Sequence, residues 1–256
     1  MTHKIGIVGV GGAGRALFSA VDSIPDAEIT ALCDIDGDAL SRVASEHGVT
    51  QTYTELGSLL ETDIDIVLLS TPIQVHGEQA IAALEAGKHV LCQYIAAMNM
   101  DEAKKLLRLT GSTGLKYMFI ETDCYEPKNV LMKELARKGA LGTPTLGRGH
   151  YIHDCKHMGR REDGILTWRG KLWMEGPGAR VNAVHTCQPL IEVFGERIQE
   201  VYTYGPGAHT MPEYQVNDRV TSVGRLPSGR IIELEHDFLS WRPMRTPRGV
   251  SHSWRT

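Results

Sequence analysis

The amino-acid sequence predicts an α/β protein in which a doubly wound parallel sheet is followed by an α+β domain whose sheet is mainly antiparallel. Three observations support this prediction. Continuous apolar runs alternate with segments of helical spacing as far as residue 120, a glycine-rich turn follows the first run, and a hairpin-like pair of runs lies near the C-terminus. Uninterrupted apolar runs are typical of strands that helices cover on both faces.

In the first half, predicted strands alternate with predicted helices and glycine turns. The strands cover residues 4–9, 29–33, 64–70, 88–92 and 115–120, and the helices cover residues 15–21, 77–86 and 100–109. This alternation favours crossover connections, and therefore a parallel sheet.

The second half has a different pattern. A helix is expected over residues 128–138, followed by a loosely alternating segment, 145–152, and a long polar stretch, 153–178. Loops of that length are more often functional than idle. An apolar helix over residues 189–194 precedes three predicted strands, which cover residues 198–204, 218–226 and 230–238.

Composition excludes several classes of protein. The 256 residues carry 27 basic and 31 acidic side chains, so no excess positive charge attracts nucleic acid or anionic lipid. The longest mostly apolar stretch, 90–100, is too short to cross a bilayer, and the first residues do not resemble a secretory signal. Five scattered cysteines form no C-x-x-C pair, so we expect reduced thiols, no metal site and a cytoplasmic protein.

The turn after the first strand carries the clearest motif. Its residues match G-x-G-x-x-G, the dinucleotide fingerprint, and the candidate cofactor contacts are Gly9, Gly11, Gly12, Ala13 and Gly14. Glycine permits the tight turn, the close approach of a pyrophosphate and the packing of helix on strand, while the helix amides attract the phosphates.

Asp34 strengthens this interpretation because it falls 20 residues after Gly14, at the end of the second predicted strand. A carboxylate at that position accepts hydrogen bonds from ribose hydroxyls. Asp36 follows, and the next arginine is Arg42, so a ribose phosphate would meet negative charge. We therefore favour NAD over NADP. The alternative is that the glycines only form a turn and that Asp34 caps the next segment.

The third predicted strand runs into Ser70, Thr71 and Pro72, at the carboxyl edge of the sheet, where open α/β sheets bind ligands. His76 follows at the start of the next helix. We expect Ser70, Thr71, Pro72 and His76 to contact the cofactor, and the alternative for His76 is a surface polar group.

These segments resemble the Gfo/Idh/MocA family of nicotinamide-dependent oxidoreductases. The glycine loop, the T-P-x-x-x-H segment ending at His76 and the A-G-K-H-V-L segment over residues 86–91 all match it. The resemblance implies a Rossmann domain over residues 1–121 and, over residues 122–256, a domain with an open sheet that holds a sugar-type substrate and supports homo-oligomers. Residues 121–125 and 147–154 further resemble the subgroup that contains NAD-dependent glycosidases.

The chain departs from the family where most members continue with glutamate, lysine and proline. Here those positions are Gln93, Tyr94 and Ile95, so no amine is available. We expect Gln93 near the cofactor and Tyr94 at the reaction centre, although an ordinary phenol with a pKa near ~10 is a poor base at neutral pH. The chain also ends soon after its last predicted strand, whereas the family continues with further strands and a helix.

His185 is the leading candidate for the catalytic acid/base. Its place before an apolar helix is similar to that of the family histidine facing the nicotinamide, and an imidazole pKa near ~6.5 suits proton removal from an alcohol. The family's usual partners are replaced by Val181 and Asn182, so orientation of His185 is expected from Asp154 or Tyr125. The alternative is a core histidine satisfied by hydrogen bonds.

The sequence therefore predicts an NAD-dependent oxidoreductase acting on a sugar, glycoside or cyclitol. The expected catalytic residues are His185, Tyr94 and Tyr125, and His153, Asp154 and Asn182 are expected to bind substrate. Two alternatives remain open. One is a glycoside hydrolase that uses transient oxidation and elimination, and the other is a catalytically silent NAD-binding sensor or assembly protein.

Overall fold

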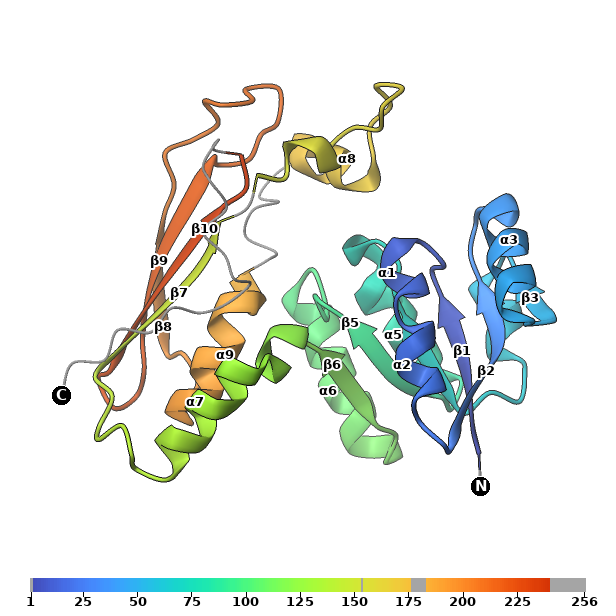
Figure 1. Cartoon of the computed structure of the whole chain (residues 1–256), viewed down its shortest axis with the longest axis horizontal. Coiled ribbons are helices and arrows are strands. Elements are labelled where there is room, and N and C mark those ends of the chain that lie inside the picture. Colours follow the sequence, from blue (N-terminus) through green and yellow to red (C-terminus); the bar gives the residue numbers. More distant parts are fainter. Residues whose placement is uncertain (1, 153, 176–182, 240–256) are drawn as a thin grey trace. The chain divides into compact units, whose positions relative to one another are not determined.

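The computed structural model describes residues 2–152, 154–175 and 183–239. The chain divides into two compact units, residues 1–120 and residues 121–256, and each unit has its own sheet (Figure 1). Three segments from the sequence analysis, namely His153, Asn182 and residues 240–256, lie outside the described residues.

The first unit is built on a six-stranded parallel sheet with the order β3-β2-β1-β4-β5-β6. The strands are β1 (His3–Val8), β2 (Ala27–Cys33), β3 (Gln51–Tyr53), β4 (Ile66–Leu69), β5 (His89–Gln93) and β6 (Tyr117–Ile120). The strand order reverses between β1 and β4, and this confirms the predicted doubly wound sheet. Ligands bind such sheets beyond the carboxyl ends of the strands at the point of reversal.

The helices of this unit are α1 (Gly12–Arg15), α2 (Phe18–Asp22), α3 (Gly37–His47), α4 (Leu56–Leu60), α5 (His76–Glu85) and α6 (Met100–Thr113), with a 3-10 turn η1 (Ile73–Val75). The predicted first helix is divided into α1 and α2. The sequence analysis identified neither α3 nor α4 nor the short edge strand β3. Asp36 begins α3 by accepting hydrogen bonds from the amides of Asp38 and Ala39.

Strand β4 shows why its apolar run has no polar interruption. Val67 and Leu69 pack in one buried cluster with α4, α5 and α6, whereas Leu68 packs in a second cluster with α2 and α3. Successive side chains of a strand point to opposite faces, so a strand covered on both faces needs apolar residues at every position.

The second unit contains a mixed four-stranded sheet with the order β7-β10-β9-β8. Its strands are β7 (Leu146–Ile152), β8 (Glu200–Tyr204), β9 (Arg219–Arg225) and β10 (Ile231–Asp237). The β10–β9 and β9–β8 pairs are antiparallel, as predicted, and the β10–β7 pair is parallel. The remaining elements are η2 (Thr122–Tyr125), α7 (Pro127–Arg137), η3 (Lys156–Met158), α8 (Trp168–Glu175) and α9 (Val184–Phe194).

Helix α9 packs closely on one face of this sheet, beside α7 (Figure 1). Two glycines of β7 permit the approach, because a Cβ at Gly147 would lie 2.6 Å from the Phe194 ring and one at Gly149 would lie 2.8 Å from the Cβ of Thr186. Leu190 is fully buried in the cluster between helix and sheet. The close packing fixes the first turn of α9, which begins five residues before the predicted start.

We expect Leu190→Ala to lower the free energy of unfolding by about 2–5 kcal/mol, because it removes a buried side chain and leaves a cavity. Leu131→Ala is the control, since Leu131 is 59% exposed on α7. Denaturant unfolding followed by circular dichroism measures both variants, and equal losses would contradict the packing described here.

Candidate functional site

The glycine loop of the first unit joins β1 to α1 and has no space for side chains at two positions. Gly9 has φ +91°, and a Cβ there would lie 2.6 Å from the carbonyl oxygen of Ser70. A Cβ at Gly14 would lie 1.9 Å from the carbonyl oxygen of Gly9. Gly11 and Gly12 instead face open space, so the loop leaves a cradle in which a bound group can approach the backbone.

Asp34 is bound to this loop by direct hydrogen bonds. One carboxylate oxygen accepts from the amide of Val10 at 2.8 Å, and the other accepts from the amide of Asp36 at 2.9 Å. Asp34 thus accepts from the segment that follows it, as the sequence alternative described, whereas the cap of α3 itself is Asp36. A carboxylate has further lone pairs beyond these two contacts, so ribose hydroxyls remain compatible with the arrangement. The loop and Asp34 therefore fit the adenosine end of NAD.

The predicted contacts after β4 form a hydrogen-bonded group within the same unit. The hydroxyl of Ser70 donates to the side-chain oxygen of Gln93 at 3.0 Å, and the hydroxyl of Thr71 donates to that of Gln79 at 2.5 Å. Pro72 precedes η1. Gln93, which ends β5, is thus joined directly to the loop after β4.

His76 is not the surface group that one sequence alternative described, because only 1% of it is exposed. Its Nε2 lies 2.8 Å from the carbonyl oxygen of Thr71, and its Nδ1 lies 2.9 Å from that of Ile95. Burial lowers the pKa of His76 below its ordinary value of 6.5, and the carbonyl contacts oppose that shift. His76 therefore holds together the two loops that follow β4 and β5, and Tyr94 lies half-buried in the second of them.

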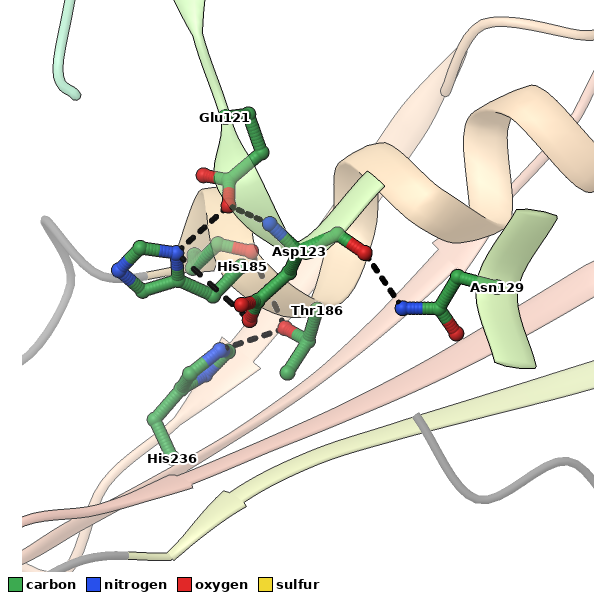
Figure 2. Close-up of polar contacts among 7 residues, drawn as sticks. Glu121, Asp123, Asn129, His185, Thr186 and His236 are labelled. Atoms are coloured by element: carbon green, nitrogen blue, oxygen red, sulfur yellow. Dashed lines mark hydrogen bonds and ion pairs between the residues drawn. The ribbon is translucent and has the colours of Figure 1, made fainter. Parts of the chain in front are cut away.

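The second unit contains a buried polar cluster around His185 (Figure 2). Nδ1 of His185 lies 2.8 Å from Oε1 of Glu121 and 3.8 Å from Oδ2 of Asp123. The exposed fractions of the three side chains are 6%, 3% and 8% for His185, Glu121 and Asp123. Asp154 or Tyr125 was the expected partner that orients His185, and the structure places Glu121 against Nδ1 instead.

Local hydrogen bonds hold the carboxylate of Glu121 and the backbone of Asp123 in place. Oε1 of Glu121 accepts from the amide of Asp123 at 3.1 Å at the start of η2, and Asn129 of α7 donates to the carbonyl of Asp123 at 2.7 Å. His185 lies in the first turn of α9, with the ring of Tyr151 stacked at 5.2 Å. The cluster therefore joins the segment of η2 and α7 to β7 and to α9, which follow much later in the sequence.

A second buried histidine lies next to this cluster. Thr186 donates its hydroxyl proton to the carbonyl of Ala183 at 3.0 Å, so its oxygen accepts from Nε2–H of His236 at 2.7 Å (Figure 2). Burial, followed by the neighbouring imidazoles of His185 and His150, lowers the pKa of His236 to about 4. His236 is therefore neutral at physiological pH.

The other predicted residues of this unit have different surroundings. Tyr125 is 66% exposed at the end of η2. Asp154 pairs with Nζ of Lys156 at 2.9 Å; burial alone would raise its pKa, but the Lys156 contacts outweigh burial and lower it. His153 and Asn182 lie outside the described residues.

Sequence reasoning missed the roles of Glu121 and Asp123, although both belong to a segment that it quoted. The available signal was a pair of carboxylates, two residues apart, directly after the last strand of a parallel sheet. The side-chain ligand atoms of Glu121, Asp123 and His185 all lie within 4.8 Å of one another, so the cluster can orient a proton-accepting imidazole or hold a cation. Among the described helices, none is long and apolar enough to cross a membrane.

Comparison with known proteins agrees with both units of the fold. Residues 3–120 match the family model GFO_IDH_MocA, described as an oxidoreductase family with an NAD-binding Rossmann fold. The chain is 26% identical to a glycosyl hydrolase family 109 protein of Solibacter usitatus, and the match covers 94% of this chain and 62% of that protein. The chain thus spans less than two thirds of this relative's length.

Solved structures share the fold over almost the whole chain. An oxidoreductase domain protein from Kribbella flavida superposes with a TM-score of 0.82 at 28% identity, covering 94% of this chain and 69% of that one. A scyllo-inositol dehydrogenase from Lactobacillus casei, with bound NAD(H) and scyllo-inositol, superposes with a TM-score of 0.78 at 20% identity. The match covers 93% of this chain and 70% of that one.

We expect Gly14→Ala to destabilise the protein by about 1–3 kcal/mol and to abolish NAD binding, because the new Cβ collides with the carbonyl of Gly9. In the matched variant Gly12→Ala the Cβ points into open space, so the fold persists and only NAD affinity falls. Thermal unfolding and calorimetric titration with NAD separate the two effects. Undiminished NAD binding by both variants would contradict the cradle.

The depressed pKa of His236 predicts loss of stability in acid. Between pH 6.5 and about pH 4 the unfolded histidine binds a proton that the folded one does not, so the free energy of unfolding falls as pH falls. From pH 7 to pH 5 the contribution is roughly 2 kcal/mol. His236→Gln, which keeps an N–H donor for Thr186, should reduce this pH dependence in denaturant unfolding. The exposed control His3→Gln should not, and equal slopes for all three proteins would contradict the assignment.

Proposed function

We propose that the protein is an NAD-dependent oxidoreductase. The first support is the match of its first unit to the Gfo/Idh/MocA family of NAD-binding oxidoreductases. The protein transfers a hydride between nicotinamide and a hydroxyl-bearing carbon of a sugar, glycoside or cyclitol. The observation that carries the proposal is the buried contact of 2.8 Å between His185 and Glu121, because alcohol oxidation needs an oriented base.

The cofactor residues of the proposal all lie in the first unit. The cradle at Gly11 and Gly12 would hold the pyrophosphate, and the carboxylate of Asp34 would accept hydrogen bonds from the ribose hydroxyls. His76 keeps the loops after β4 and β5 in register, so that Ser70, Thr71 and Gln93 face the cofactor from one edge of the sheet. NAD, when bound, supplies a hydride acceptor, and the protein supplies alignment and proton transfer.

The proton chemistry of the proposal belongs to His185. Donation of Nδ1–H to the carboxylate of Glu121 fixes the tautomer and leaves the lone pair on Nε2 as a proton acceptor. As the carbon loses its hydride, Nε2 takes the hydroxyl proton, and the negative charge of Glu121 stabilises the imidazolium that forms. Tyr94, Tyr125, His153, Asp154 and Asn182 are proposed to surround the substrate.

A second candidate function is glycoside hydrolysis, and the relatives named as glycosyl hydrolase family 109 proteins favour it. In this reaction the same hydride transfer oxidises the sugar and makes the adjacent C–H acidic. A base then removes that proton, the leaving group departs, water adds to the resulting alkene, and the hydride returns to the carbon. The reaction consumes water and produces no net NADH.

Two further features of the proposal concern the whole protein. We propose that it forms a homo-oligomer through the sheet of the second unit, where β8 exposes Val201, Tyr202 and Tyr204 by 56–67%. We also propose a cytoplasmic location, which the five free cysteines support, because oxidising compartments favour disulfides.

Calorimetry with NAD, followed by turnover assays on cyclitols and aryl glycosides, tests the proposal. We expect saturable NAD binding and turnover that falls about 10²–10⁴-fold in His185→Gln and less in Glu121→Gln. NAD affinity should stay unchanged, because both residues belong to the second unit. His150→Gln, which alters a histidine–carboxylate pair on β7 and β10, is the matched control.

The products separate the candidate functions. Accumulated NADH indicates net oxidation, whereas free phenol without NADH indicates hydrolysis. NAD binding without turnover on any substrate would favour the silent sensor. Absence of NAD binding would overturn the oxidoreductase proposal altogether.

A further inference from the structure

The cluster of Glu121, Asp123 and His185 has the composition and geometry of a metal centre. We propose that these three side chains bind one divalent transition-metal ion, of the class of Zn²⁺, Mn²⁺ or Co²⁺, through Oε1, Oδ2 and Nδ1. The three ligands come from the segment around η2 and the first turn of α9, which both belong to the second unit.

The distances suit a single ion. Nδ1 of His185 is 2.8 Å from Oε1 of Glu121 and 3.8 Å from Oδ2 of Asp123. One ligand atom from each of the three residues lies within 4.8 Å of the other two. Ligand atoms bound about 2.1 Å from one ion lie roughly 3–3.5 Å apart. Small movements of the side chains therefore suffice to coordinate a cation.

Charge supplies the second argument. Two buried carboxylates face one imidazole nitrogen, so the cluster gathers two acidic groups away from water. Buried carboxylates are costly, and a cation between them lowers that cost. A divalent cation between two carboxylates and a neutral imidazole brings the net charge of the group to zero.

The second oxygen of Glu121 is an independent indication of a ligand. Oε2 is buried and has no hydrogen-bond donor in the part of the chain that the structure describes, although the residue is only 2% exposed. Figure 2 shows this carboxylate turned toward the imidazole of His185. Buried carboxylate oxygens are nearly always satisfied, so an orphan beside two further ligand atoms points to a bound cation.

The ligand set selects the class of ion. Imidazole with two carboxylates suits zinc and the neighbouring transition metals, whereas Ca²⁺ and Mg²⁺ prefer oxygen ligands alone. The donor of Asn129 to the backbone of Asp123 and the stacked ring of Tyr151 hold the ligands from outside. Three protein ligands leave positions open for water or a substrate oxygen.

Metal binding and the hydrogen bond that orients the proposed base both use Nδ1, so this consequence rests on the proposed function. Nδ1 carries either a hydrogen donated to Glu121 or a metal ion. When the ion occupies Nδ1 of a neutral imidazole, the proton lies on Nε2, which then cannot accept a proton from an alcohol. The ion-bound and base-competent forms of His185 are therefore alternative states.

Titration of chelator-treated, dialysed protein with Co²⁺ tests the inference, using calorimetry and the visible absorption spectrum of the ion. We expect one ion per chain and a spectrum of low-symmetry nitrogen and oxygen coordination. Asp123→Asn and His185→Gln should each weaken binding at least tenfold. His150→Gln should bind as the wild type does, because its partner Glu235 lies outside the cluster.

Absence of saturable Co²⁺ binding by the wild-type protein would overturn the inference without any variant. Binding that persists unchanged in Asp123→Asn and His185→Gln, with folding checked by circular dichroism, would also overturn it and assign the ion to another place. NAD calorimetry on the same samples keeps the two proposals apart. Loss of NAD binding refutes the oxidoreductase, and loss of Co²⁺ binding refutes the metal centre.

Discussion

The hydrogen bond between Glu121 and His185 joins residues that are 64 positions apart in the chain, and both residues are buried. A buried carboxylate and a buried imidazole are each costly without the other, because neither can be hydrated. The pair therefore forms only when the segment around η2 and the first turn of α9 pack within hydrogen-bond distance of each other. The small residues Gly147 and Gly149 on β7 make that meeting possible, since α9 approaches the sheet closely only where no Cβ intervenes.

A steric constraint has the corresponding role in the first unit. Gly9 and Gly14 approach other backbone atoms so closely that any side chain would collide, while Gly11 and Gly12 leave space open. The difference separates glycines that build the turn from glycines that admit a ligand. Asp34 then joins the turn to the end of β2 through the amide of Val10. The conformation of the cradle is therefore fixed by contacts within the chain, and such preorganisation reduces the entropic cost of binding.

The polar cluster of the second unit unites the proposed chemistry and the proposed metal centre. Both depend on one nitrogen of His185 and on the carboxylates that face it. Where the family that the sequence resembles usually has a lysine, this chain has Tyr94, so no amine supplies positive charge at that position. A protonated imidazole or a bound cation provides positive charge of the kind that stabilises a developing alkoxide. The residues of this cluster thus set the local charge, the orientation of the His185 imidazole and its capacity to accept a proton.

The β-α alternation of the first unit, the glycine turn and the antiparallel strands near the C-terminus could be predicted from the residues alone. These features are periodic or local, and the side-chain pattern of a covered strand follows directly from backbone geometry. Short elements such as β3 and α4 were missed because three to five residues carry little periodic signal. The parallel pairing of β7 with β10 was missed because it joins segments about 85 residues apart.

Which polar groups meet depends on the packing of elements that are distant in the sequence. His185 could be selected from the sequence, but its contact with Glu121 could not, because 64 residues separate the two and loop closure sets their approach. The same holds for His76, whose partners Thr71 and Ile95 lie on two different loops. Periodicity tells which face of an element is buried, whereas the partner of a buried polar atom depends on how distant elements pack.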